Sequence, residues 1–76
     1  MMNLYSMLYR IASTSTPEGI HAEATKRGVP WDNNDAFMGQ CEQLVGKRHL
    51  DDMAPGELQV VYTALHDGKF DGLIKP

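Results

Sequence analysis

The sequence has 76 residues and a formal net charge of -3, which is enough chain for one small domain, and we expect residues 1–76 to form it. The mildly acidic charge argues against a protein held on nucleic acid chiefly by neutralising phosphates. Cys41 is the only cysteine, which excludes a disulfide within the chain and favours a reducing cytoplasm, and no apolar run approaches the ~18 residues that cross a bilayer.

The N-terminal segment has the periodicity of an amphipathic helix from Asn3 to Ala12. Its apolar residues fall at the i, i+3, i+4, i+7 spacing of one helix face, and they are Leu4, Met7, Leu8 and Ile11. Tyr5 and Tyr9 extend this stripe on an adjacent face. Because the segment lacks the basic start and cleavage site of a signal peptide, we expect a cytoplasmic protein that does not contact membranes.

A second helix is predicted from Pro17 to Arg27. Thr16 is suited to cap it, Pro17 suits the first helical position, and Gly28 can take the left-handed conformation that ends it. Val29 can then fold back on the last turn. Few residues of this helix are apolar, so we expect it to pack at the periphery.

The third and fourth helices carry stronger apolar stripes. Asp32 or Asn33 is predicted to start the third helix and Gly46 to end it, with Trp31 just before the cap. Pro55 is predicted to start the fourth helix, with Met53 and Leu58 at the spacing of a hydrophobic staple. The stripe of the third helix is Phe37, Cys41, Leu44 and Val45, and that of the fourth is Leu58, Val61, Tyr62 and Leu65.

The Asp67-Gly68 turn ends the fourth helix, and the apolar residues Phe70, Leu73 and Ile74 can fold back on the helices. Strand-type alternation is absent from the longer segments. The predicted fold is therefore all-α: a small bundle of three to four short helices with a packed C-terminal tail.

The candidate chemical motifs are incomplete. His21-Ala22-Glu23 matches half of the zinc deaminase signature, but the Pro-Cys-x-x-Cys half is missing, and an ordinary exposed helix face explains it better. His49 with the nearby carboxylates lacks the ligand spacing of zinc sites, and Cys41 on an apolar stripe is typical of a small core residue. We expect no catalytic residues, no cofactor and no metal site, and hence a protein that is not an enzyme.

The remaining function class is binding, and the alternatives are the binding of DNA and the binding of a protein. Ala24, Gly28 and Val29 have the spacing of a helix-turn-helix, in which Lys26 and Arg27 could touch phosphates, although the reading helix would begin with acidic residues. Lys47-Arg48-His49 is the densest positive run and could instead clamp an acidic partner. Aromatic and arginine residues dominate interaction hot spots, so Trp31, Tyr5 and Tyr9 join that run as candidates for protein binding.

The stretch from Asn34 to Phe70, about half of the chain, resembles the GemA family of Mu-like phage regulatory proteins. Shared features are a helix, a Gly-Lys connection, a short leucine-based segment, and a Pro-x-Glu-Leu helix start that leads to a Gly-x-Phe end. The matching residues are Gly46-Lys47-Arg48, Leu50-Asp51-Asp52-Met53, Pro55-Gly56-Glu57-Leu58, Leu65 and Gly68-Lys69-Phe70. The chain departs from the family at Ala54, where a Thr or Ser cap is usual, and at Gly56.

The resemblance implies a phage or prophage accessory protein that modulates host gene expression or DNA metabolism, and it supplies no catalytic residues. We therefore expect a host or phage protein as the partner, with a helix-turn-helix-like DNA-binding regulator as the alternative. Self-association into a homo-oligomer stays open, since small domains often gain stability in this way.

Overall fold

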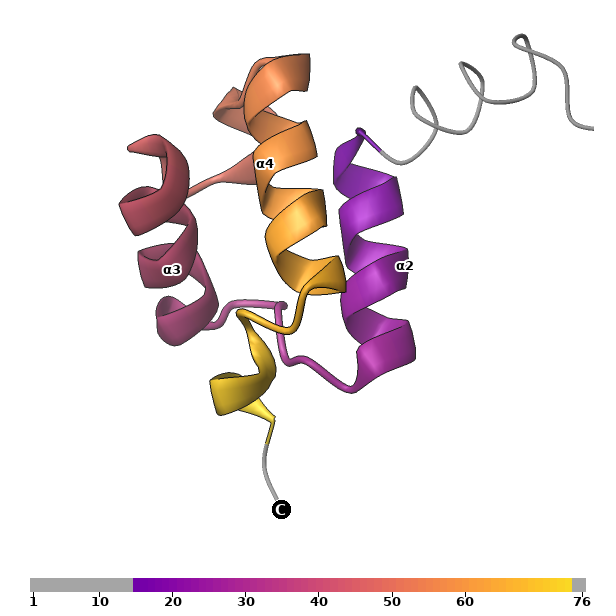
Figure 1. The fold of residues 1–76 in the computed structure, drawn as a ribbon. Coiled ribbons are helices and arrows are strands. Elements are labelled where there is room, and N and C mark those ends of the chain that lie inside the picture. The colour runs from indigo at the N-terminus through magenta and orange to yellow at the C-terminus, as the bar shows by residue number, and fades with distance from the viewer. Residues whose placement is uncertain (1–14, 75–76) are drawn as a thin grey trace, which may run out of the picture.

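The computed structural model describes residues 15–74, which form a small all-α bundle (Figure 1). Three α-helices and two short 3-10 helices follow one another along this part of the chain, and no strand occurs within it. They are α2 (Pro17–Arg27), α3 (Asp35–Val45), η1 (Leu50–Asp52), α4 (Pro55–His66) and η2 (Asp71–Leu73). The helix predicted from Asn3 to Ala12, with Tyr5 and Tyr9, lies outside the described residues.

Helix α4 is the centre of the bundle. It packs against α2 on one side and α3 on the other, so the stripe with the strongest periodicity in the sequence faces two neighbours (Figure 1). Leu58, Val61, Ala64 and Leu65 of α4 are all buried. The core comprises Ile20, Ala24, Val29, Phe37, Cys41, Leu50, Met53, Leu58, Val61, Ala64, Leu65 and Phe70. Because residues from every described helix except η2 enter it, this part of the chain shares one core.

Helix α2 is not peripheral, and that prediction was wrong. Ile20 and Ala24 have no exposed surface, and they lie on the side of α2 that packs against α4. The low apolar content of α2 was misleading, because a helix packed on one side needs only a narrow apolar stripe. The small side chain of Ala24 also permits close approach of the two helices.

The predicted start of α3 was wrong by one or two residues. Asn34 is the cap: its Oδ1 accepts a hydrogen bond from the Phe37 amide at 2.9 Å, and its backbone is extended. Asn33 cannot take this role, because its φ of +49° places it in the left-handed region. A cap residue needs an extended backbone for its side chain to reach the free amides of the first turn. Asp32 is exposed.

The predicted ends of α2 and α3 are confirmed. Gly28 is left-handed, and the amides of Gly28 and Val29 donate to the carbonyls of Thr25 and Ala24 at 3.1 and 2.8 Å, the two bonds of a Schellman motif. This geometry turns Val29 back into the core, where it is 2% exposed. The left-handed Gly46 ends α3 in a similar way, with its amide bonded to the Glu42 carbonyl.

Helix α4 begins without a capping side chain, because Ala54 has no acceptor. Glu57 compensates in part: its Oε1 accepts a hydrogen bond from the Ala54 amide at 2.8 Å, which is half of a capping box. Met53 and Leu58 are both buried, as the predicted hydrophobic staple requires. The C-terminal tail packs as predicted through Phe70, which is 1% exposed, whereas Ile74 is 37% exposed.

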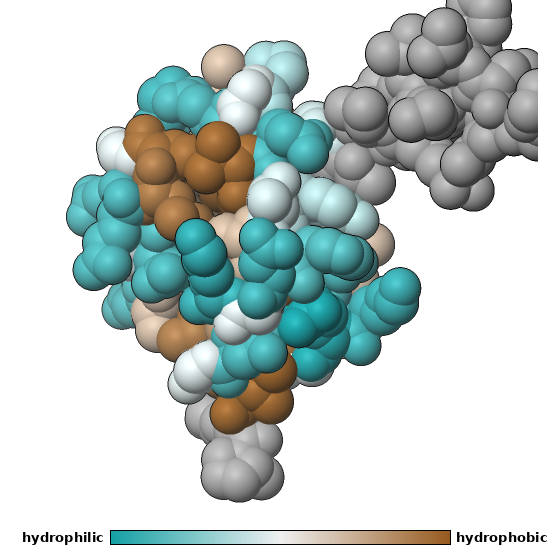
Figure 2. All heavy atoms as spheres, in the orientation of Figure 1, coloured by the Kyte–Doolittle hydropathy of each residue, from teal (hydrophilic) through white to brown (hydrophobic). Residues whose placement is uncertain are grey.

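None of the helices in the described part of the chain is long and apolar enough to cross a bilayer. Polar side chains cover much of the face shown in Figure 2, and an apolar patch lies between α3 and α4 in this view.

Candidate functional site

Three of the predicted interaction residues line one surface cleft. Trp31 reaches it from the connection between α2 and α3, and Arg48 and His49 reach it from the connection between α3 and η1. The cleft has a volume of about 290 Å³. Its apolar lining comes from Trp31, Phe37, Met38 and Leu50, and its polar lining from His21, Asp32, Asn33, Arg48, His49 and Asp51.

Trp31 is half-buried and held by two contacts with α2. Its ring stacks on the imidazole of His21, with centroids 3.8 Å apart and planes 10° from parallel. Its Nε1 donates a hydrogen bond to Thr25 Oγ1 at 3.0 Å. Both contacts restrict the indole, so a partner that packs on it loses little conformational freedom of this side chain on binding.

His21 was missed as a site residue. It is half-buried beside Trp31 and lines the cleft, whereas the sequence suggested only an exposed helix face. No local signal pairs the two residues. They meet because the left-handed Gly28 reverses the chain after α2 and returns Trp31 to that helix.

Arg48 provides positive charge at the cleft and is held loosely. Its guanidinium nitrogens lie 3.5 Å from Asp35 Oδ1 and 3.8 Å from Glu42 Oε1, and its side chain is 39% exposed. Exposed pairs at such distances contribute only about 0–1 kcal/mol. The guanidinium can therefore exchange these carboxylates for those of a partner at small cost. His49 beside it is exposed.

Lys47 contacts a different part of the bundle from Arg48. Its Nζ donates a hydrogen bond to Glu57 Oε1 at 2.8 Å, which ties the connection after α3 to the first turn of α4. This hydrogen bond, together with the one from the Ala54 amide, lowers the pKa of Glu57 below its ordinary value of about 4.5. Lys47 does not line the cleft, so the positive run divides into a structural lysine and two cleft residues.

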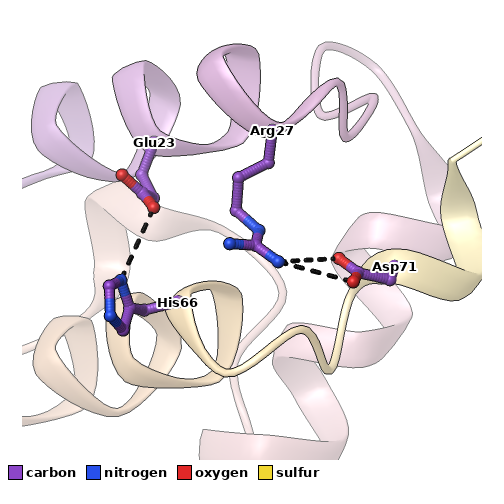
Figure 3. A network of polar contacts seen from close by, with 4 residues as sticks. All are labelled: Glu23, Arg27, His66 and Asp71. Atoms are coloured by element: carbon purple, nitrogen blue, oxygen red, sulfur yellow. Dashed lines mark hydrogen bonds and ion pairs between the residues drawn. The ribbon is translucent and has the colours of Figure 1, made fainter.

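Arg27 takes part in a polar network that joins α2 to the C-terminal end of the bundle (Figure 3). Its Nη2 donates to both carboxylate oxygens of Asp71, at 3.3 and 3.4 Å. Glu23, one turn earlier on α2, lies 3.8 Å from Nδ1 of His66, a distance that gives an ion pair only when the imidazole is protonated. Arg27 therefore has a structural role in placing η2, while Lys26 beside it is exposed.

The remaining chemical candidates do not converge in the described part of the chain. No group of three histidine, cysteine or acidic side chains is placed to hold a metal ion among residues 15–74. Cys41 is a fully buried core residue, as predicted, and burial raises the pKa of its thiol to about 11. A thiol with that pKa is almost entirely protonated near neutral pH and is a poor nucleophile.

The geometry gives little support to a helix-turn-helix. The main packing contacts of α2 and α3 are both with α4, whereas the two helices of that motif pack on each other. The N-terminus of α3 carries the exposed carboxylates of Asp32 and Asp35. Comparisons of the chain with protein-family models, with curated proteins and with solved structures gave no match.

Proposed function

We propose that this chain is a small, non-enzymatic regulatory protein of phage or prophage type that binds a host or phage protein through the cleft at Trp31, Arg48 and His49. The observation that carries the proposal is the convergence of an immobilised indole and a loosely paired guanidinium on one cleft. Tryptophan and arginine are the residue types most enriched where interfaces gain their binding energy.

The size of the cleft favours a protein side chain as its occupant. Its volume of about 290 Å³ lies just below the range of roughly 300–1,000 Å³ for small-molecule sites. One or two side chains of a partner fill such a space. The apolar lining suits an aliphatic or aromatic anchor, and Arg48 suits an acidic residue beside that anchor.

The resemblance to the GemA family supports the proposal of a phage or prophage regulatory protein, and membership of that family stays a prediction. Several residues that carry it have structural roles here: Gly46 and Gly68 are left-handed at helix ends, and Leu58 and Phe70 are buried. Arg48, Leu50 and Asp51 are the matching residues that line the cleft, and Arg48 is the one among them with a positive charge. We propose that the cleft carries the regulatory function, and that the matching residues that end helices or fill the core do not. A substitution of Arg48 can therefore test this proposal.

Affinity capture with the full chain tests the proposal. A binding partner should be retained by the wild-type chain, lost or weakened at least tenfold by Arg48→Gln, and retained by Lys69→Gln. The control removes the same charge from an exposed lysine that does not line the cleft. Titration of the purified partner should change the fluorescence of Trp31, which is the only tryptophan in the chain.

Equal loss of the partner in both variants would point to net charge rather than to the cleft. A shift of duplex DNA at low micromolar protein and moderate salt, with no protein captured, would support the DNA-binding alternative instead. In that case Lys26→Gln should weaken the shift, because Lys26 is an exposed lysine at the end of α2.

A further inference from the structure

A second hollow, separate from the cleft, is largely apolar and lies between α3 and α4. Its apolar lining comes from Leu44 of α3 and from Val60 and Ala64 of α4, and its polar lining comes from Gln59, Thr63, Asp67 and Lys69. Its volume is about 240 Å³. Val60 is 45% exposed, the largest exposed fraction of any large apolar side chain among residues 15–74. We call this hollow the α3–α4 groove.

The described part of the chain begins next to a residue that lines this groove. Ser15, the first described residue, donates a hydrogen bond from its Oγ to Oε1 of Gln59. Gln59 is itself one of the residues that line the groove. Ser15 therefore contacts a residue that lines the same groove as Val60, the most exposed large apolar side chain among residues 15–74.

The sequence of that segment matches the groove in character and length. Its apolar stripe needs a surface on which to be buried, and its only charged side chain is Arg10. A helix over residues 3–12 would be about 15 Å long, and the groove side of α4 from Gln59 to Asp67 spans about 12 Å. Residues 13 and 14 can bridge about 10 Å to Ser15 when extended, which is enough for the chain to reverse.

We propose that residues 3–12 of the same chain dock as an amphipathic helix in the α3–α4 groove and cover Val60 and Leu44. The connection through Ser15 favours the same chain over a second copy, since a short linker holds the segment at an effective concentration in the millimolar range. Docking would bury the N-terminal stripe together with the apolar patch seen between α3 and α4 in Figure 2. This proposal does not depend on the function of the cleft.

Limited proteolysis of the full chain with chymotrypsin tests the docking, because Tyr5 and Tyr9 are cleavage sites within the segment. Cleavage follows the fraction of time that the segment is undocked. Val60→Asp should accelerate cleavage at these tyrosines by about tenfold or more, and Val60→Leu should leave it slow. Val60 is exposed enough for both substitutions to leave the bundle folded, which circular dichroism at the start of digestion checks.

Light scattering under the same conditions shows whether the groove is occupied by the N-terminal segment of the same chain or by a second copy of the chain. A monomer with protected tyrosines that Val60→Asp deprotects supports docking within the chain. Equal cleavage rates in the wild-type chain and Val60→Asp would overturn the proposal. Protection that is lost on dilution, as a dimer dissociates, would overturn it in favour of a second copy.

Discussion

Shortening Ile20 tests the central role of α2 most directly. The side chain is fully buried on the face of α2 that packs against α4. Removal of a buried Ile side chain down to Ala costs about 2–5 kcal/mol. A domain of this size has only roughly 3–5 kcal/mol of net stability. Ile20→Ala should therefore be largely unfolded at 25 °C, and Ile20→Val, which costs about 1 kcal/mol, should remain folded but weakened.

Ile74 offers a control with the same side chain in a different environment. It is 37% exposed and lies at the end of the described chain, so Ile74→Ala should cost less than about 1 kcal/mol. The comparison keeps the change in chemistry constant and varies only the burial. It therefore separates the loss of packing from any general effect of removing an isoleucine.

Urea unfolding followed by circular dichroism at 222 nm measures these differences. With an m-value of about 1 kcal/mol/M for a small domain, Ile20→Val should lower the midpoint by about 1 M. Ile74→Ala should lower it by much less. Similar midpoints for Ile20→Ala, Ile74→Ala and the wild-type chain would refute the reasoning, because α2 would then be the peripheral helix that its composition suggested.

Three further predictions follow from single residues. The pKa of Glu57 is lowered in the folded chain, so the stabilisation from its charge is present above the ordinary pKa of about 4.5 and is lost as the pH falls through the folded-state value. Urea midpoints between pH 6 and pH 3 should fall less steeply for Glu57→Gln than for the wild-type chain, and Lys47→Met should reduce the slope in the same direction. Cys41, with a pKa of about 11, should react with a disulfide reagent at pH 8 at least roughly 100-fold more slowly in the folded chain than in urea; equal rates would show that the thiol is accessible. Gly68→Ala should destabilise the fold by about 1 kcal/mol or more, and by more than Gly46→Ala. Both glycines have positive φ, but only at Gly68 would an added Cβ lie 2.9 Å from a carboxylate oxygen, that of Asp71 in η2. Thermal melts that rank the two variants in the opposite order would contradict this prediction.

Local signals were sufficient for most of the structural features that depend on neighbours in the chain. Thr16 and Pro17 start α2, Gly28 and Gly46 are left-handed at helix ends, and Met53 and Leu58 are buried as a pair at the start of α4. Each feature involves atoms within about one helical turn, so residue type and spacing carry the information. The cap of α3 was misplaced because three adjacent residues can all cap, and backbone geometry selects Asn34 among them.

The candidate site depends instead on residues that are far apart in the chain. Sequence singled out Trp31, Arg48 and His49 as separate candidates, but the stack of Trp31 on His21 arises only when the chain reverses after α2. Lys47 and Arg48 are neighbours in the sequence, yet one contacts α4 and the other lines the cleft. The directions in which the two side chains point depend on how the connection after α3 crosses the bundle. Residue type alone does not predict that path.

The amino-acid sequence by itself determined an all-α chain, the residues at which most of its helices begin and end, and the apolar stripes of α3 and α4, because these are set by interactions between near neighbours. Tertiary structure alone decided that α4 is central, that Ile20 and Ala24 of the weakly apolar α2 are core residues, and that an aromatic stack and an arginine share one cleft. Those outcomes depend on which faces meet across the bundle, where burial of apolar area and the path of the connections act together over residues far apart in the chain.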